Sequence, residues 1–173
     1  MATTKPPDDP IADGYTWLEP IAWDRRCFGC GSNNPSGLHM QFFRKNDAVV
    51  SWLSIPDHLC GWAGVAHGGV ICTILDEVMS WTAMHLVRRL ILTRSMEVTF
   101  LKPVATGRRV KTVGRLESRI NDRQATLQAH LEDESGVCCA RSRGTFALFT
   151  VAAGRRMKVI DPAVLDHFER FIG

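Results

Sequence analysis

One segment, residues 66–85, constrains the fold of this chain more than any other. It begins with His67, Gly68 and Gly69 and continues as an apolar sequence with helical periodicity. At 100° per residue, one broad face of this helix is hydrophobic and carries Val70, Ile71, Ile74, Leu75, Val78, Met79 and Trp81. Because a face this wide is stable only when buried, we expect the rest of the chain to cover the helix.

The opposite face of the predicted helix carries one acid, Asp76, among small residues: Cys72, Thr73, Ser80 and Ala83. Small neighbours let another backbone or a ligand approach the carboxylate closely. Glu77 is one step further round the helix, and we expect it to reach solvent. The pattern alone is equally compatible with a core helix whose Asp76 simply faces water.

Two consecutive glycines, Gly68 and Gly69, mark the start of this helix. Glycine is a poor residue for a helix interior, but nothing bulky covers the free backbone N–H groups of the first turn. A polarisable carbonyl oxygen could bind at such a helix start.

Strand patterns flank the helix on both sides. Residues 38–44 and 48–55 predict an antiparallel hairpin that turns at Asn46 and Asp47. After the helix, alternating patterns predict four strands, near residues 96–100, 107–119, 124–131 and 137–151. Asp161 and Pro162 are a good N-cap and first-turn pair for a short helix that runs to Phe171.

One apolar helix among antiparallel strands predicts an α+β domain, in which a sheet of five to six strands wraps around the helix. We expect an N-terminal arm over residues 1–26, the domain over 27–154 and the short helix within 155–173. Residues 15–23 are expected to pack on the domain as a short helix or an extended strip. Uncovered sheet edges favour a homodimer or a homotetramer, a dimer of dimers.

Composition excludes several classes of protein. The chain has 173 residues, 45% of them hydrophobic, which is enough for one domain with a core. The net charge of +3 is dispersed, so we expect no nucleic-acid partner, although an anionic small molecule would be suitable. We see no signal peptide and no stretch as long as a membrane span, and we expect a cytoplasmic protein without a membrane partner.

Six cysteines are expected to be reduced thiols rather than a disulfide framework. Cys27 and Cys30, two residues apart, have the spacing of a metal or redox pair. Zinc would need two more ligands, and the candidates lack a second close pair: His39, His58 and Cys60. A redox pair would be expected at a helix start, whereas turn-forming residues follow Cys30. A structural turn is therefore the favoured interpretation, with a metal site as the alternative.

Three separated motifs, together with the order of the elements, resemble the hotdog-fold acyl-CoA thioesterases, in particular those like the phenylacetate-pathway thioesterase and the human thioesterase superfamily members. The first is His67-Gly68-Gly69 with Asp76 nine residues after the histidine. The second is Cys27-Phe28-Gly29-Cys30-Gly31 followed by Asn34-Pro35 and Gly37-Leu38. The third is Thr93, seven residues before Phe100.

The resemblance implies a role for each site residue. Asp76 would act as general base or nucleophile, and the Gly69 backbone N–H of the neighbouring subunit would polarise the thioester oxygen. His67 would orient the loop or the thioester, and Thr93 would hold the water. The implied substrate contacts include Gly68 and Ser80, and no metal or cofactor is needed.

Other interpretations of two site residues remain open, and the sequence differs from the family pattern at one position. The residues alone are equally compatible with His67 as part of a structural turn and with Thr93 as an ordinary strand residue. Some relatives carry an asparagine where this chain has Gly61, so one substrate hydrogen bond is missing or is supplied otherwise.

The expected function is hydrolysis of an acyl-CoA to the acid and free CoA. A second hypothesis is an acyl-CoA-binding protein of the same fold without turnover. A dehydratase or hydratase of the same fold would need a different arrangement of histidine and acid. A zinc-linked interaction protein built on Cys27 and Cys30 is the fourth possibility.

Overall fold

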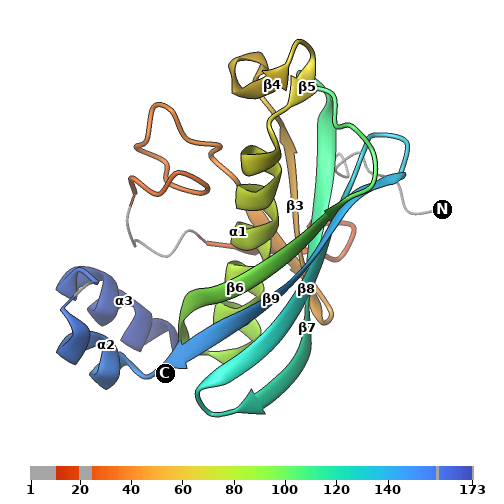
Figure 1. The fold of residues 1–173 in the computed structure, drawn as a ribbon. Helices are drawn as coiled ribbons and strands as arrows, with labels where there is room; N and C mark the ends of the chain where they lie inside the picture. Colours follow the sequence, from red (N-terminus) through yellow and green to blue (C-terminus); the bar gives the residue numbers. More distant parts are fainter. Residues whose placement is uncertain (1–10, 20–24, 159, 173) are drawn as a thin grey trace.

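The computed structural model describes residues 11–19, 25–158 and 160–172. One long helix, α1 (Gly68–Val87), lies against an antiparallel sheet that curves around it (Figure 1). The sheet order is β1-β2-β3-β7-β8-β9-β6. These seven strands are β1 (Thr16–Leu18), β2 (Phe42–Lys45), β3 (Ala48–Ser54), β6 (Leu90–Phe100), β7 (Arg109–Asn121), β8 (Gln124–Glu132) and β9 (Cys138–Phe149). The predicted α+β class is confirmed.

The strand count is slightly higher than the expected five to six. β1 supplies the additional strand, because Thr16 to Leu18 pair with Phe42 to Arg44 at the edge of the sheet. The extended form expected within residues 15–23 is therefore present at 16–18, and residues 20–24 lie outside the described residues. Two short strands, β4 (Cys60–Trp62) and β5 (Val65–Ala66), form a separate pair before α1.

The apolar face of α1 forms the centre of the core, as predicted. Ile74, Leu75, Val78 and Met79 have no exposed surface. The helix ends at Arg88, which adopts a left-handed conformation (φ 56°) while its N–H donates to the Met84 carbonyl at 3.2 Å.

One expectation about α1 needs correction. The helix does reach the length and mean hydropathy of a membrane span, 20 residues and 1.3, contrary to the expectation that no stretch does. However, 61% of its most apolar window is buried inside the fold. Burial of this kind is also what the core helix of a globular domain shows.

The centre of the sheet approaches α1 very closely at Gly114 on β7. A Cβ atom at this position would lie 2.8 Å from the Val78 carbonyl oxygen and would overlap Thr82 Oγ1. Thr82 Oγ1 in turn donates to the Val78 carbonyl at 2.6 Å. Glycine is therefore required for the observed packing of β7 on the helix.

The ends of three predicted strands differ clearly from the structure. β6 begins at Leu90, six residues before the predicted start at residue 96. β2 begins at Phe42 rather than at residue 38, because the N–H groups of Leu38 and Met40 donate to the Phe28 and Gly29 carbonyls of the preceding loop. β9 ends at Phe149, two residues before the predicted end. Thr150 caps a helix there, its hydroxyl accepting from the Ala153 N–H at 3.2 Å.

Two helices complete the chain. α2 (Val151–Met157) was not predicted, and it spans the boundary expected at residue 154. α3 (Pro162–Ile172) confirms the helix expected after Asp161. Both pack at one end of the sheet through a small apolar cluster of Leu90, Val151, Leu165 and Phe168 (Figure 1).

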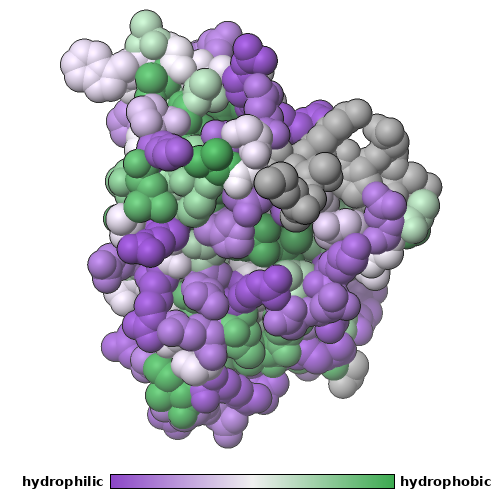
Figure 2. Space-filling view, turned by 90° about the vertical axis from the view of Figure 1, so that its right-hand side faces the viewer, coloured by the Kyte–Doolittle hydropathy of each residue, from purple (hydrophilic) through white to green (hydrophobic). Residues whose placement is uncertain are grey.

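The side of the molecule at the right of Figure 1 is drawn in Figure 2, where hydrophilic side chains cover much of the surface and hydrophobic ones form small groups between them.

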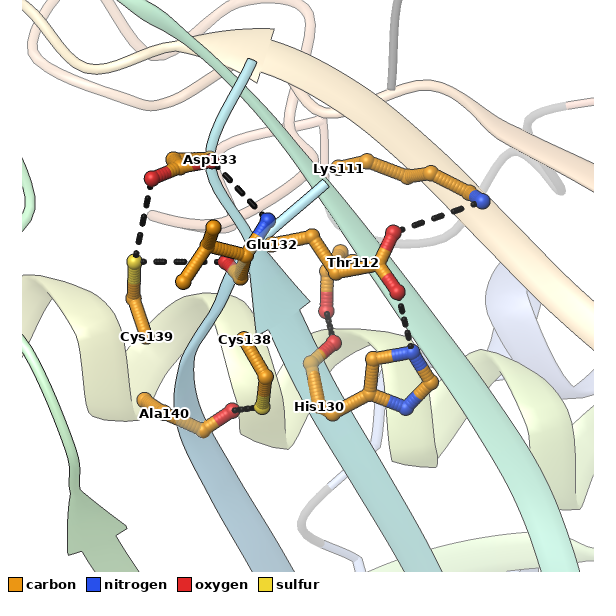
Figure 3. A network of polar contacts seen from close by, with 9 residues as sticks. Lys111, Thr112, His130, Glu132, Asp133, Cys138, Cys139 and Ala140 are labelled. Atoms are coloured by element: carbon orange, nitrogen blue, oxygen red, sulfur yellow. Dashed lines mark hydrogen bonds and ion pairs between the residues drawn. The ribbon is translucent and has the colours of Figure 1, made fainter. Parts of the chain in front are cut away.

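The sheet also holds a buried cation, Lys111 on β7. Its Nζ lies 3.5 Å from Glu132 Oε2 on β8, and Glu132 Oε1 lies 3.1 Å from His130 Nε2 (Figure 3). Glu132 is thus the shared partner of a lysine and a histidine.

Candidate active site

Asp76 and Thr93, far apart in the sequence, meet between α1 and the edge strand β6. Thr93 Oγ1 donates to Asp76 Oδ1 at 2.8 Å. β6 shifts its register against β9 between Thr93 and Ser95. A bulge of this kind re-aims side chains, and here it lies beside the threonine that contacts the carboxylate. The structure therefore brings together the acid and the hydroxyl singled out in the sequence.

The carboxylate of Asp76 lies in a partly buried environment on α1. Burial raises the pKa of Asp76 above its ordinary value, the hydrogen bond from Thr93 opposes that rise, and the nearby Cys27 adds to it. A carboxylate with a raised pKa is a stronger base when ionised. Asp76 therefore has the environment expected of a group that accepts a proton from water.

His67 and Gly69 form the N-terminal cap of α1. The Gly69 N–H donates to His67 Nδ1 at 2.9 Å, so the histidine ring occupies the amide that was expected to be free. The ring also lies near Gly61, where a Cβ would come within 3.4 Å of His67 Cδ2. Phe100 from β6 lies over Gly68. The structural role of His67 is thus a side-chain helix cap, and its side chain remains exposed to solvent.

Gly69 and Asp76 of one chain are too far apart to act on the same carbonyl group. Seven residues separate them on one straight helix, which corresponds to about 10 Å along the axis at 1.5 Å per residue. A carbonyl carbon within reach of Asp76 cannot also place its oxygen on that amide.

The small-residue face of α1 is only partly accessible. Cys72, Thr73 and Asp76 are partly exposed, whereas Ser80 is 8% exposed and Ala83 is fully buried. Ser80 lies deeper than a residue on an open face, and its contact with substrate stays a prediction.

Glu77 does not reach solvent freely, contrary to expectation. It is partly buried, and its Oε1 lies 3.2 Å from Cys27 Sγ in a hydrogen bond. Burial raises the pKa of Glu77 to about 8. The Cys30 thiol donates to Cys27 and lowers the pKa of Cys27, and the same hydrogen bond raises the pKa of Cys30. The sequence pointed to Cys27 and Cys30 as a pair, but it missed their contact with Glu77, which has no periodicity signal of its own.

A cleft of about 810 Å³ has Thr93, but not Asp76, in its lining. Thr93 lines it together with the start of β6, the turn between β7 and β8, the end of β9 and α2. Four of the residues that line it are arginines: Arg89, Arg94, Arg123 and Arg156. This concentration of guanidinium groups suits an anionic ligand such as a phosphate ester.

Sequence comparison with protein families finds a match in the central part of the chain. The family model of the thioesterase superfamily matches residues 63–140, which include the helix cap, Asp76 and Thr93. This part of the chain is therefore similar in sequence to the thioesterase superfamily. No curated protein sequence matches the chain.

Structural comparison finds solved proteins with the same fold. AziG of S. sahachiroi superposes with a TM-score of 0.60 at 24% identity, over 65% of this chain and 93% of AziG. The thioesterase HI1161 of Haemophilus influenzae superposes with a TM-score of 0.62 at 18% identity, over 70% of this chain and 85% of HI1161. The protein smu.793 of Streptococcus mutans UA159, bound to acetyl-CoA, superposes with a TM-score of 0.60 at 16% identity, over 64% of this chain and 89% of smu.793. Similarities at these identities establish the fold, and the expected hotdog fold is confirmed.

Proposed function

We propose that this protein hydrolyses an acyl-CoA thioester to a carboxylic acid and CoA. The observation that carries this proposal is the partly buried Asp76 carboxylate, which accepts a hydrogen bond from Thr93 beside an arginine-lined cleft. The match of residues 63–140 to the thioesterase superfamily supports hydrolysis of a thioester. The related fold that binds acetyl-CoA supports an acyl-CoA as the substrate.

In the proposed reaction Asp76 acts as general base. It takes a proton from a water that Thr93 helps to hold, and that water attacks the thioester carbonyl carbon. The carbon–sulfur bond then breaks, the CoA sulfur leaves as a thiolate, and it takes up the proton that Asp76 accepted. Direct attack by Asp76 as nucleophile would give a mixed anhydride that water hydrolyses to the same products.

The oxyanion needs an N–H donor, and the Gly69 N–H of the same chain lies too far from Asp76. Because about 10 Å of helix separates Asp76 from its own Gly69, we propose that the Gly69 N–H of a second copy is the donor. His67 would have to rotate away to free that amide, and its exposure to solvent leaves room for this movement. The protein would therefore work as a homodimer or a dimer of dimers.

The cleft beside Thr93 is the proposed site for the phosphates of CoA. Replacing Arg94 or Arg123 with alanine should raise KM for an acyl-CoA by about threefold to tenfold, since each charged contact contributes about 1 kcal/mol. KM for the matching acyl-pantetheine, which lacks these phosphates, should not change. Arg108→Ala, outside the cleft, serves as control. Equal effects on both substrates would place the phosphates elsewhere.

The decisive experiment measures free-thiol release from acetyl-, phenylacetyl-, benzoyl- and palmitoyl-CoA by wild type and Asp76→Asn. Loss of the general base should lower kcat by about 10²-fold to 10⁴-fold with little change in KM. Asp57→Asn, an exposed acid outside the site, should behave as wild type. If no substrate is hydrolysed but one binds tightly in calorimetry, the protein is an acyl-CoA binder without turnover.

A mixing experiment tests the shared site. Asp76→Asn chains mixed with Gly69→Pro chains, which lack the N–H, should recover up to about a quarter of wild-type activity, because half the dimers are mixed and each has one intact site. Gly69→Ala keeps the N–H and is the matched control. No recovery in confirmed mixed dimers would place the whole site within one chain.

A further inference from the structure

Two sulfur atoms and one carboxylate come together beside the candidate active site. Cys27 and Cys30 belong to the loop before β2, and Glu77 belongs to α1, which this loop runs alongside (Figure 1). The two Sγ atoms and a carboxylate oxygen of Glu77 all lie within 4.8 Å of one another. Chain segments 50 residues apart thus direct three metal-binding groups at one point.

The backbone of the loop holds Cys27 in a defined position. The N–H of Gly31 donates to the Cys27 carbonyl at 3.0 Å, and the backbone amides of Gly29 and Cys30 lower the pKa of the Cys27 thiol. A Cβ at residue 31 would lie 2.5 Å from the Arg25 carbonyl oxygen and from the Cys27 nitrogen. Only glycine allows this tight turn, in which backbone amides face a sulfur as they do around a metal-bound thiolate.

A second glycine lets the carboxylate reach the sulfurs. A Cβ at Gly29 would overlap Glu77 Cγ. The loop is also anchored in register, since the Phe28 and Gly29 carbonyls accept from the Leu38 and Met40 N–H groups at 2.9 and 3.0 Å. The close approach of Glu77 is therefore built into the loop rather than being a chance contact of a surface acid.

We propose that Cys27, Cys30 and Glu77 bind one zinc ion, with water in the fourth position. Zinc prefers sulfur, nitrogen and carboxylate oxygen in a tetrahedron, with bonds of about 2.3 Å to sulfur and about 2.0–2.2 Å to oxygen. Such bonds place the donor atoms about 3.3–3.8 Å apart, so the groups need to close by only about 1 Å. Magnesium and calcium prefer oxygen ligands throughout and do not suit two thiolates.

The proposed ion acts as a structural clamp. It joins the loop of residues 25–37 to α1 at Glu77, the residue next to Asp76 in the chain. Both sulfurs bind as thiolates and Glu77 binds as a carboxylate, so binding releases the protons that the three groups hold, and the free energy of binding adds to the stability of this part of the fold. The inference is independent of the thioesterase proposal, because it concerns metal content and stability rather than turnover.

The test starts from the full-length protein, purified under reducing conditions without chelator. Zinc content by mass spectrometry should be about one ion per chain. Apoprotein titrated with Co²⁺ should develop thiolate-to-cobalt charge transfer and the intense visible bands of a tetrahedral site. Zinc should also raise the thermal unfolding midpoint of the apoprotein.

Three variants identify the ligands. The double variant Cys27→Ser, Cys30→Ser should lose both the zinc and the cobalt bands. Glu77→Gln should bind Co²⁺ at least about tenfold more weakly. Cys60→Ser, which removes an exposed cysteine outside the cluster, should bind metal as wild type does.

Several results would overturn the proposal. Less than about 0.1 zinc per wild-type chain, together with no cobalt–thiolate bands from the reduced apoprotein, excludes the site whatever the variants do. Retention of zinc by a folded double variant places the metal elsewhere. Unchanged cobalt affinity in Glu77→Gln removes the carboxylate from the ligand set.

Discussion

Thr93 Oγ1 on β6 donates to Asp76 Oδ1 on α1 at 2.8 Å, and this hydrogen bond joins the edge of the sheet to the central helix. It stabilises the ionised form of the carboxylate, whereas burial stabilises the neutral form, and burial has the larger effect on the pKa. The pair therefore sets the pH at which Asp76 becomes a base.

Replacing Thr93 with alanine should shift the acid limb of the activity profile to higher pH. Removal of the hydroxyl raises the pKa of Asp76, so the ionised base appears only at higher pH. kcat should also fall by about tenfold to a hundredfold, the equivalent of a hydrogen bond to a charged group. The measurement is kcat/KM against pH, and Thr93→Ser should restore both the limb and the rate. A lower rate with an unmoved limb would mean that Thr93 does not act through Asp76.

Stability should fall in acid because of His85, near the end of α1. Burial, with Arg44 and Arg88 nearby, lowers the pKa of His85 from its usual 6.5 to about 4, and its Nε2 has no hydrogen-bond partner among the described residues. The unfolded chain then binds a proton that the folded chain does not, so the free energy of unfolding decreases as pH falls from about 6.5 to about 4.

His85→Phe should reduce this pH dependence while keeping a ring stacked on Trp81, whose centroid lies 5.5 Å from that of His85. The measurement is the urea midpoint at pH 7 and pH 5. His58→Gln, at an exposed histidine, should retain the wild-type difference between the two pH values. An unchanged difference in His85→Phe would assign the acid sensitivity to other groups.

Gly114→Ala should destabilise the fold by about 1–3 kcal/mol, since the added methyl group overpacks the contact between β7 and α1. The new Cβ would meet the Val78 carbonyl oxygen, which is fixed by the helix and cannot move aside. Urea unfolding measures the change. Ser118→Ala introduces alanine at an exposed site on the same strand and should lie within about 0.5 kcal/mol of wild type. Equal stability of the two variants would contradict the close packing.

The stability of the fold with a buried Lys111 should depend on the counter-charge of Glu132. Glu132→Gln removes the counter-charge and should cost about 1–3 kcal/mol, less than for a fully buried pair because Glu132 retains one fifth of its side-chain exposure. The double variant Lys111→Met, Glu132→Leu should recover most of the loss. Additive losses in the double variant would show that the two charges do not interact.

The sequence by itself determined the elements whose signals are local. Apolar residues recur at every turn of α1, and in the strands after it apolar and polar residues alternate or the segment lies between turn-forming residues. The helix, the strands and the α+β class can therefore be predicted from the order of the residues. α2 was missed because its start depends on the Thr150 cap at the end of a long apolar strand, where periodicity favoured strand up to Val151. Asp76 was noticed because a lone acid among small residues is visible within one helix, and its proposed role came from the resemblance in the spacing from His67.

Only the tertiary structure decided which side chains meet. The Thr93 hydroxyl reaches Asp76 through the pairing of β6 at the edge of the sheet, and Glu77 reaches Cys27 because a loop 50 residues away closes over α1. The occupation of the Gly69 amide by His67 depends on a side-chain rotamer. These contacts arise from loop closure and packing between distant segments, for which periodicity along the chain holds no signal.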